Sequence, residues 1–177
     1  MLQIYGVEGR EDALEDVADA LRRSVEGLRS AIFELRLERT LGRSFATSLQ
    51  ELVGLTRRMS RKRFAVNLEV EEGFPRELSR RAGGGLIRIL QEAMNNARRH
   101  SSPDHILVRL WREGDVMLAE VADDGRGFDA GSPDGGVGLS AMRQRASSLG
   151  GGLTIESKPG SGTRVRFEVP LDALIDQ

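Results

Sequence analysis

The sequence contains no cysteine, and this absence excludes a disulfide framework and any metal site built on thiolates. The formal net charge is −1, so the chain lacks the basic excess of a dedicated nucleic-acid-binding domain. No apolar run approaches the roughly 20 residues that a membrane-spanning helix needs, and no signal peptide opens the chain. We expect a cytoplasmic chain with no membrane span and no nucleic-acid partner, whether or not a longer parent protein is attached to a membrane.

Lysine is also scarce, and this matters beside a stretch rich in glycine. The chain has two lysines, and neither lies in "VADDGRGFDAGSPDGGVGL", residues 121–139. The lysine-containing phosphate-binding pattern G-x-x-x-x-G-K-[ST] is absent, and so is the dinucleotide-binding pattern G-x-G-x-x-G. Phosphates bound here would therefore need another partner, such as Mg²⁺, to neutralise their charge.

Apolar periodicity predicts a long helix over residues 11–38, since apolar side chains recur at spacings of three and four for three heptads. The apolar positions are Leu14, Val17, Leu21, Val25, Leu28, Ile32 and Leu35. This stripe fits either an ordinary core helix or half of a helical-hairpin dimer. A second helical pattern covers residues 41–60.

From residue 64 onward, alternation and helical periodicity predict a series of strands and helices. The expected elements are a strand at 64–71, a helix at 76–100, strands at 105–112 and 116–123, a helix at 139–149, and strands at 153–157 and 163–169. Hairpins dominate this order. We therefore expect an α+β fold, a two-layer α/β sandwich whose mixed, mainly antiparallel sheet carries helices on one face, preceded by one or two N-terminal helices.

Three polar residues of the helix at 76–100 share one face, because Glu92, Asn96 and His100 are spaced i, i+4 and i+8. Asparagine is a poor helix former, since its side chain competes for backbone hydrogen bonds. A carboxylate, an amide and an imidazole in a row suggest a functional site, although a solvent-facing polar stripe would give the same pattern. The glycines at 83–85 should weaken the first half of this helix.

The glycine-rich stretch has the features of a nucleotide-binding loop. Asp123 ends a strand and can accept a hydrogen bond from the exocyclic amine of an aminopurine. Gly125 and Gly127 follow at two-residue steps, where glycine lets the backbone approach a ligand closely. Gly136 and Gly138 precede a helix, and the free backbone amides at a helix start favour phosphate. The side-chain oxygen of Asn96 could hold Mg²⁺.

Three motifs in this order resemble the Bergerat-type ATP site of the gyrase, heat-shock chaperone, histidine kinase and mismatch-repair superfamily. They are "EAMNNARRH", "DDGRGF" and "GVGL", which ends at Leu139. The stretches "GLSAMRQRA" and "GSGTRVRFEVP" are similar to those of sensor histidine kinases related to the nitrate/nitrite and fatty-acid desaturation sensors. The resemblance covers residues 64–170 strongly. Residues 11–60 match more loosely, and there "LRSAIFELR" looks like the second helix of the dimerisation and phosphotransfer domain.

The resemblance implies a role for each motif in binding ATP and Mg²⁺. Asp123 would bind the adenine amine, and Gly125 and Gly127 would let the base lie against the backbone. Asn96 would hold Mg²⁺, and Glu92 would orient water, metal or the attacking imidazole. The residues expected near the phosphates are His100, Arg99, Gly136, Gly138 and Leu139.

A histidine kinase transfers the γ-phosphoryl group of ATP to a histidine, but neither His100 nor His105 stands in the acceptor context of the resembled class. The chain is therefore expected to be the C-terminal part of a longer kinase of a two-component phosphorelay. Residues 1–38 would be a partial dimerisation helix, and residues 39–177 the ATP-binding catalytic domain. The expected partners are ATP, a response regulator, the phosphoacceptor helix of the full-length kinase and, as one option, a second copy of the chain.

Two other functions stay open from the sequence. The first is an ATPase of the same superfamily or a serine kinase of the anti-sigma type, in which Glu92 would act as a general base. The second is a dimerisation module with a degenerate nucleotide pocket, against which the three intact motifs argue.

Overall fold

The computed structural model describes residues 17, 18, 20, 21, 24, 25, 28, 44–60, 63–75, 77–129 and 137–174. The chain divides into two compact units, Met1–Arg39 and Thr40–Gln177. In the first unit the described residues are helical. Four apolar side chains of the predicted stripe are 45–65% exposed: Val17, Leu21, Val25 and Leu28. The stripe residues Leu14, Ile32 and Leu35 lie outside the described residues.

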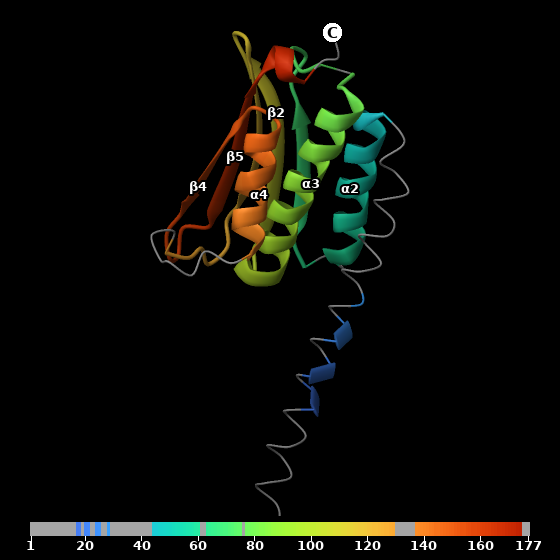
Figure 1. Ribbon diagram of the computed structural model, residues 1–177. Coiled ribbons are helices and arrows are strands. Elements are labelled where there is room, and N and C mark those ends of the chain that lie inside the picture. The colour runs from blue at the N-terminus through green and yellow to red at the C-terminus, as the bar shows by residue number, and fades with distance from the viewer. Residues whose placement is uncertain are drawn as a thin grey trace, which may run out of the picture. The chain divides into compact units, whose positions relative to one another are not determined.

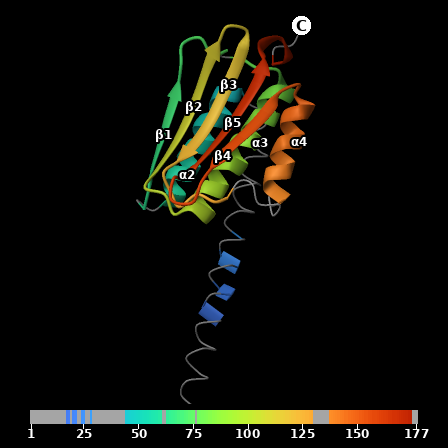
Figure 2. The same cartoon turned by 90° about the vertical axis from the view of Figure 1, so that its left-hand side faces the viewer.

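The second unit contains a five-stranded sheet with the order β1-β2-β3-β5-β4. Its strands are β1 (Ala65–Val70), β2 (His105–Glu113), β3 (Val116–Asp123), β4 (Gly152–Ser157) and β5 (Thr163–Pro170). β1 pairs with β2 in parallel, and the other neighbours are antiparallel. The predicted mixed, mainly antiparallel sheet is thus confirmed, and Figure 2 shows its open face toward the viewer.

Three helices cover the other face of the sheet, as Figures 1 and 2 show. They are α2 (Phe45–Ser60), α3 (Arg80–Asn96) and α4 (Val137–Ser148). The core lies between the two layers, where its largest side chains are under 2% exposed. These include Leu52, Leu86, Leu90, Ile106, Leu110, Met117, Met142 and Phe167. The predicted two-layer α+β sandwich with helices on one face is therefore confirmed.

The glycine run at 83–85 lies inside α3 and brings its neighbours close. A Cβ on Gly83 would lie 3.4 Å from Cβ of Phe45, which belongs to α2. A Cβ on Gly85 would lie 2.8 Å from Cδ1 of Leu149, which directly follows α4. The missing side chains thus let α3 pack tightly between its two neighbours, and this packing offsets the poor helix propensity of glycine.

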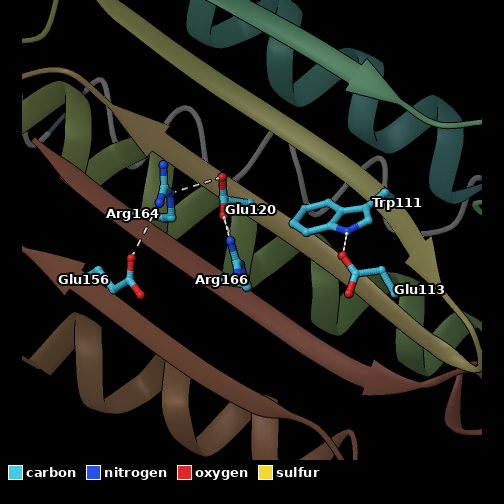
Figure 3. Close-up of polar contacts among 6 residues, drawn as sticks. All are labelled: Trp111, Glu113, Glu120, Glu156, Arg164 and Arg166. Carbon is cyan, nitrogen blue, oxygen red and sulfur yellow. Dashed lines mark hydrogen bonds and ion pairs between the residues drawn. The ribbon is translucent and has the colours of Figure 1, made fainter.

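The open face of the sheet carries a charged cluster and a tryptophan (Figure 3). Glu120 is only 7% exposed there, and its carboxylate lies 2.9 Å from Arg166 Nη2 and 3.4 Å from Arg164 Nε. The Trp111 indole donates a hydrogen bond of 2.7 Å to Glu113, and the Arg166 guanidinium carbon lies 5.6 Å from the ring centroid. The ion pairs supply the partners that a buried carboxylate needs.

Candidate functional site

Three segments that are far apart in the sequence meet beside the end of α3. They are η1 (Ala97–Ser101), a π-helical turn that continues α3, the loop that follows β3, and the start of α4. Ser101 in the turn contacts Asp123 at the end of β3, and Glu92 in α3 contacts Gly138 in α4. Most of the predicted site residues therefore lie in one region.

Asp123 is held by two hydrogen bonds that end on the same carboxylate oxygen. Its Oδ1 accepts one from the Ser101 hydroxyl and one of 3.0 Å from the backbone N–H of Gly125. Among the described residues, none donates a hydrogen bond to Oδ2. The carboxylate is thus fixed on one side and can accept a further hydrogen bond on the other.

The helix carrying the predicted polar row does not stay α-helical to its end. It changes to the π-helical turn η1 after Asn96, and Ser102 then adopts a left-handed conformation with φ of 50°. Four residues overshoot one α-helical turn, but a π turn has more residues per turn. His100 therefore lies more nearly above Asn96 than regular α-helical spacing predicts.

The side chains of Glu92 and Asn96 occupy the part of α3 beside α4. A Cβ on Gly138 would overlap Oε1 of Glu92, so only glycine leaves the carboxylate in this position. The half-buried Asn96 side chain makes no hydrogen bond to another described residue, whereas Oδ1 of the neighbouring Asn95 accepts one of 3.2 Å from Arg98 Nη2. Asn96 thus keeps its amide available, and Asn95 does not. Leu139 follows at the start of α4 and is half-buried, and Gly136 lies outside the described residues.

His100 lies in a basic environment at the end of α3. Partial burial of the imidazole lowers its pKa, and the positive charges of Arg99 and Arg126 lower the pKa further. The Glu92 carboxylate acts in the opposite direction but does not outweigh them. His100 is therefore neutral at pH 7, since its pKa lies below the usual value of about 6.5, and Glu92 is close enough to influence it.

The two glycines of the loop are required by packing within the protein. A Cβ on Gly125 would overlap the Ser101 carbonyl group. Gly127 has a φ of +58°, and a Cβ there would lie 2.7 Å from the backbone oxygen of Gly162. The loop thus lies tightly against both η1 and the β4–β5 turn. Close approach of a base to these glycines stays a prediction.

Further contacts, which the sequence alone did not reveal, hold this loop in place. The backbone N–H of Arg126 donates to the Ser101 carbonyl (2.8 Å), and that of Gly160 donates to the Arg126 carbonyl (2.7 Å). The Phe128 N–H donates to Oγ of Ser157 (2.9 Å). The Phe128 side chain is 37% exposed, so it does not fill the core.

A second clamp joins the loop to the start of β2. Oδ1 of Asp124 accepts hydrogen bonds from the backbone N–H groups of Asp104 (2.9 Å) and His105 (2.8 Å), and Oδ2 lies 2.8 Å from Nδ1 of His105. Burial raises the pKa of Asp124, but the hydrogen bonds from His105 and Asp104 lower it more, so the pKa falls below its usual value. His105 is thus part of a structural contact.

The donor set beside Asn96 suits a cation that brings other ligands with it. No group of three or more histidine, cysteine, aspartate or glutamate residues in the described part of the chain is arranged to hold a metal ion. A hard cation such as Mg²⁺ prefers oxygen ligands and keeps several waters, and it is commonly bound by one or two protein oxygens together with substrate phosphates. The Asn96 amide oxygen and the nearby Glu92 carboxylate fit that pattern.

Comparison with known proteins identifies the family. Residues 82–173, about half of the chain, match the model of the histidine kinase-, DNA gyrase B- and HSP90-like ATPases. The chain belongs to this family. It therefore contains the family's ATP-binding domain, and the resemblance drawn from the three motifs is confirmed.

Individual relatives narrow the comparison to sensor kinases. The chain is 30% identical to a sensor-like histidine kinase of Chloroflexus aurantiacus, over 90% of this chain and 28% of that protein. It is 39% identical to the sensor protein VraS of Staphylococcus aureus, over 49% of this chain and 25% of VraS. The chain thus spans about a quarter of the length of these relatives.

Solved structures support the fold. The histidine kinase domain of the blue-light activated kinase EL346 from Erythrobacter litoralis matches with a TM-score of 0.63 at 23% identity, over 72% of this chain and 61% of that one. Full-length ShkA in complex with AMPPNP also matches with a TM-score of 0.63, at 22% identity, over 92% of this chain and 39% of that one. No helix in the described part of the present chain is long and apolar enough to cross a membrane.

Proposed function

We propose that this chain is the catalytic part of a sensor histidine kinase and positions Mg-ATP for transfer of the γ-phosphoryl group to a histidine on another helix. The observation that carries the proposal is the pairing of two open acceptor groups in one region. Oδ2 of Asp123 is available on one side, and the Asn96 amide and Glu92 carboxylate are available beside Gly138. The sensor-kinase relatives favour this reaction.

Asp123 would select the purine. Oδ2 would accept a hydrogen bond from the exocyclic amine of adenine, while Ser101 and Gly125 hold Oδ1 in place. The loop is fixed by η1 and the β4–β5 turn, so the carboxylate is oriented before the nucleotide arrives. Such preorganisation reduces the ordering cost of binding.

The phosphate end would lie between α3 and the start of α4. The Asn96 oxygen would hold Mg²⁺, which supplies positive charge against the phosphate oxygens. Gly136, Gly138 and Leu139 would offer backbone N–H groups at the helix start. His100, neutral at pH 7, could donate a hydrogen bond to a phosphate oxygen.

The reaction itself is mainly positioning and charge neutralisation. A ring nitrogen of the acceptor histidine would form a bond to the γ-phosphorus, while the bond from that phosphorus to the bridging oxygen breaks and ADP leaves. Glu92 would orient the acceptor by accepting a hydrogen bond from the other ring nitrogen, whose proton is lost as phosphohistidine forms. A response regulator would then receive the phosphoryl group.

The domain arrangement follows from this function. Residues 1–38 would be a remnant of the dimerisation and phosphotransfer hairpin, and residues 39–177 the catalytic domain. The exposed apolar side chains of Val17, Leu21, Val25 and Leu28 support the first part, because a contiguous exposed apolar stripe marks an interaction site. A cytoplasmic location would place the site where ATP is available.

A phosphorylation assay in trans tests the proposal. The chain is incubated with Mg-[γ-³²P]ATP and a longer version that contains an acceptor histidine but carries Asp123→Ala in its own ATP site. We expect acid-labile phosphohistidine on the longer version, and Glu92→Gln in the present chain should reduce it at least tenfold. Release of inorganic phosphate without phosphohistidine would instead favour the ATPase alternative, and acid-stable phosphoserine would favour the serine kinase.

A further inference from the structure

We infer that Ser101 is a positioning residue for base selection: its hydroxyl fixes Oδ1 of Asp123, so that Oδ2 is presented to purines that carry an exocyclic amine. The inference rests on the proposed function, because it assigns a partner to the same nucleotide site. It adds a residue that lies outside the three sequence motifs and 22 positions away from the carboxylate it holds.

The first support is the hydrogen bonding of the Asp123 carboxylate. A hydroxyl and a backbone N–H both donate to Oδ1, and among the described residues nothing donates to Oδ2. A carboxylate that has lost one of two donors on the same oxygen can rotate and turn Oδ2 away from the base. Hydrogen bonds to charged groups are stronger than neutral ones, so the hydroxyl has a real hold on the carboxylate.

The second support is the rigidity of Ser101 itself. The residue is 5% exposed, and its carbonyl accepts a 2.8 Å hydrogen bond from the N–H of Arg126. Gly125 packs against it so closely that a Cβ would overlap its backbone and hydroxyl. Ser101 is therefore held by the same loop whose aspartate it orients.

The third support is the local helix geometry. Ser101 is the last residue of the π-helical turn, and Ser102 directly after it is left-handed. π turns within helices occur frequently at functional sites. This turn buries Ser101 under the loop, while Ser102 stays exposed.

Binding of two nucleotides by the 177-residue chain tests the inference. Dissociation constants for ATP and for inosine triphosphate, which has a carbonyl in place of the amine, are measured by calorimetry with Mg²⁺ present. Ser101→Ala should raise the ATP dissociation constant about tenfold and leave that for inosine triphosphate unchanged. Ser101→Thr keeps the hydroxyl and should restore the preference for ATP, and Ser102→Ala, an adjacent exposed control, should bind both nucleotides like the parent.

A double-mutant cycle gives a second readout that does not depend on how Thr is accommodated. In an Asp123→Asn background, Ser101→Ala should cause no further loss of ATP affinity, because the two residues act through one contact. Equal weakening of both nucleotides by Ser101→Ala, or an unchanged preference for ATP, would overturn the inference while leaving the proposed function intact. A parent chain that binds no ATP would overturn the proposed function and this inference together.

Discussion

At the scale of single residues, Asp123 illustrates what sequence reasoning reached and what it missed. Its place after a strand and before glycines identified it as an acceptor, and a chemical argument about aminopurines gave it a role. Its partner Ser101 was missed, because the contact depends on a π-helical turn that no sequence period predicts. Gly125 and Gly127 were assigned to ligand approach, whereas packing against Ser101 and the β4–β5 turn already requires them.

The Asp124 clamp leads to a prediction about pH. The folded-state pKa of Asp124 lies below its unfolded value, so its contribution to stability is present above about pH 4 and is lost as the pH falls through the folded pKa. Asp124→Asn should lower the melting temperature at neutral pH by about 2–4 °C, the range expected for an exposed charged contact.

Thermal unfolding of the parent and Asp124→Asn, followed by circular dichroism between about pH 3 and pH 7, measures this effect. The difference between the two proteins should shrink at the acid end, where the parent's carboxyl also becomes neutral. A difference that stays constant or grows as the pH falls would show that the charge of Asp124 is not what stabilises the loop.

At the scale of elements, strands were more predictable than helix ends. Alternation identified β2 to β5 to within one or two residues, because each strand has one face on the core. The helix expected at 76–100 begins instead at Arg80, where the Ser79 hydroxyl accepts a 3.1 Å hydrogen bond from Ala82 N–H. Val70, expected to be buried, is 50% exposed, because it ends the edge strand β1.

Helix packing around α3 gives a prediction with a matched control. Gly85→Ala should destabilise the fold by about 1–2 kcal/mol, since its Cβ would lie 2.8 Å from the buried Leu149 side chain. Gly54→Ala, also inside a helix, should stabilise it by about 0.5–1 kcal/mol, because the nearest atom is 3.5 Å away on a flexible arginine. Urea unfolding of both variants measures the difference, and equal stabilisation by the two would contradict tight packing at Gly85.

At the scale of the whole molecule, composition and element order were enough for the fold class. The layers follow from the number of amphipathic elements, which must bury their apolar faces against one another. The charged cluster on the open face could not be foreseen, because it depends on register: Glu120 lies opposite Arg166 across β3 and β5. Burial of that carboxylate is visible only once both strands are paired.

The first unit gives a prediction about assembly. Four exposed apolar side chains on a helical segment favour association between copies of the chain. Replacing Leu21 and Leu28 together by glutamate should convert a concentration-dependent dimer to a monomer, measured by sedimentation equilibrium. ATP affinity should stay unchanged, because the nucleotide site lies within Thr40–Gln177. A parent that is monomeric at all concentrations would contradict the role assigned to this segment.

The most direct measurement compares two neighbouring amides. The account gives Asn96 a Mg²⁺ ligand's role and gives Asn95 a contact with Arg98 instead. Calorimetric titration with ATP, in Mg²⁺ and in a chelator, should show that Asn96→Ala loses most of the Mg²⁺-dependent affinity, by tenfold or more, while Asn95→Ala binds Mg-ATP like the parent. Mg-ATP binding by Asn96→Ala as tight as that of the parent would contradict the claim that this amide and Asp123 serve one bound nucleotide.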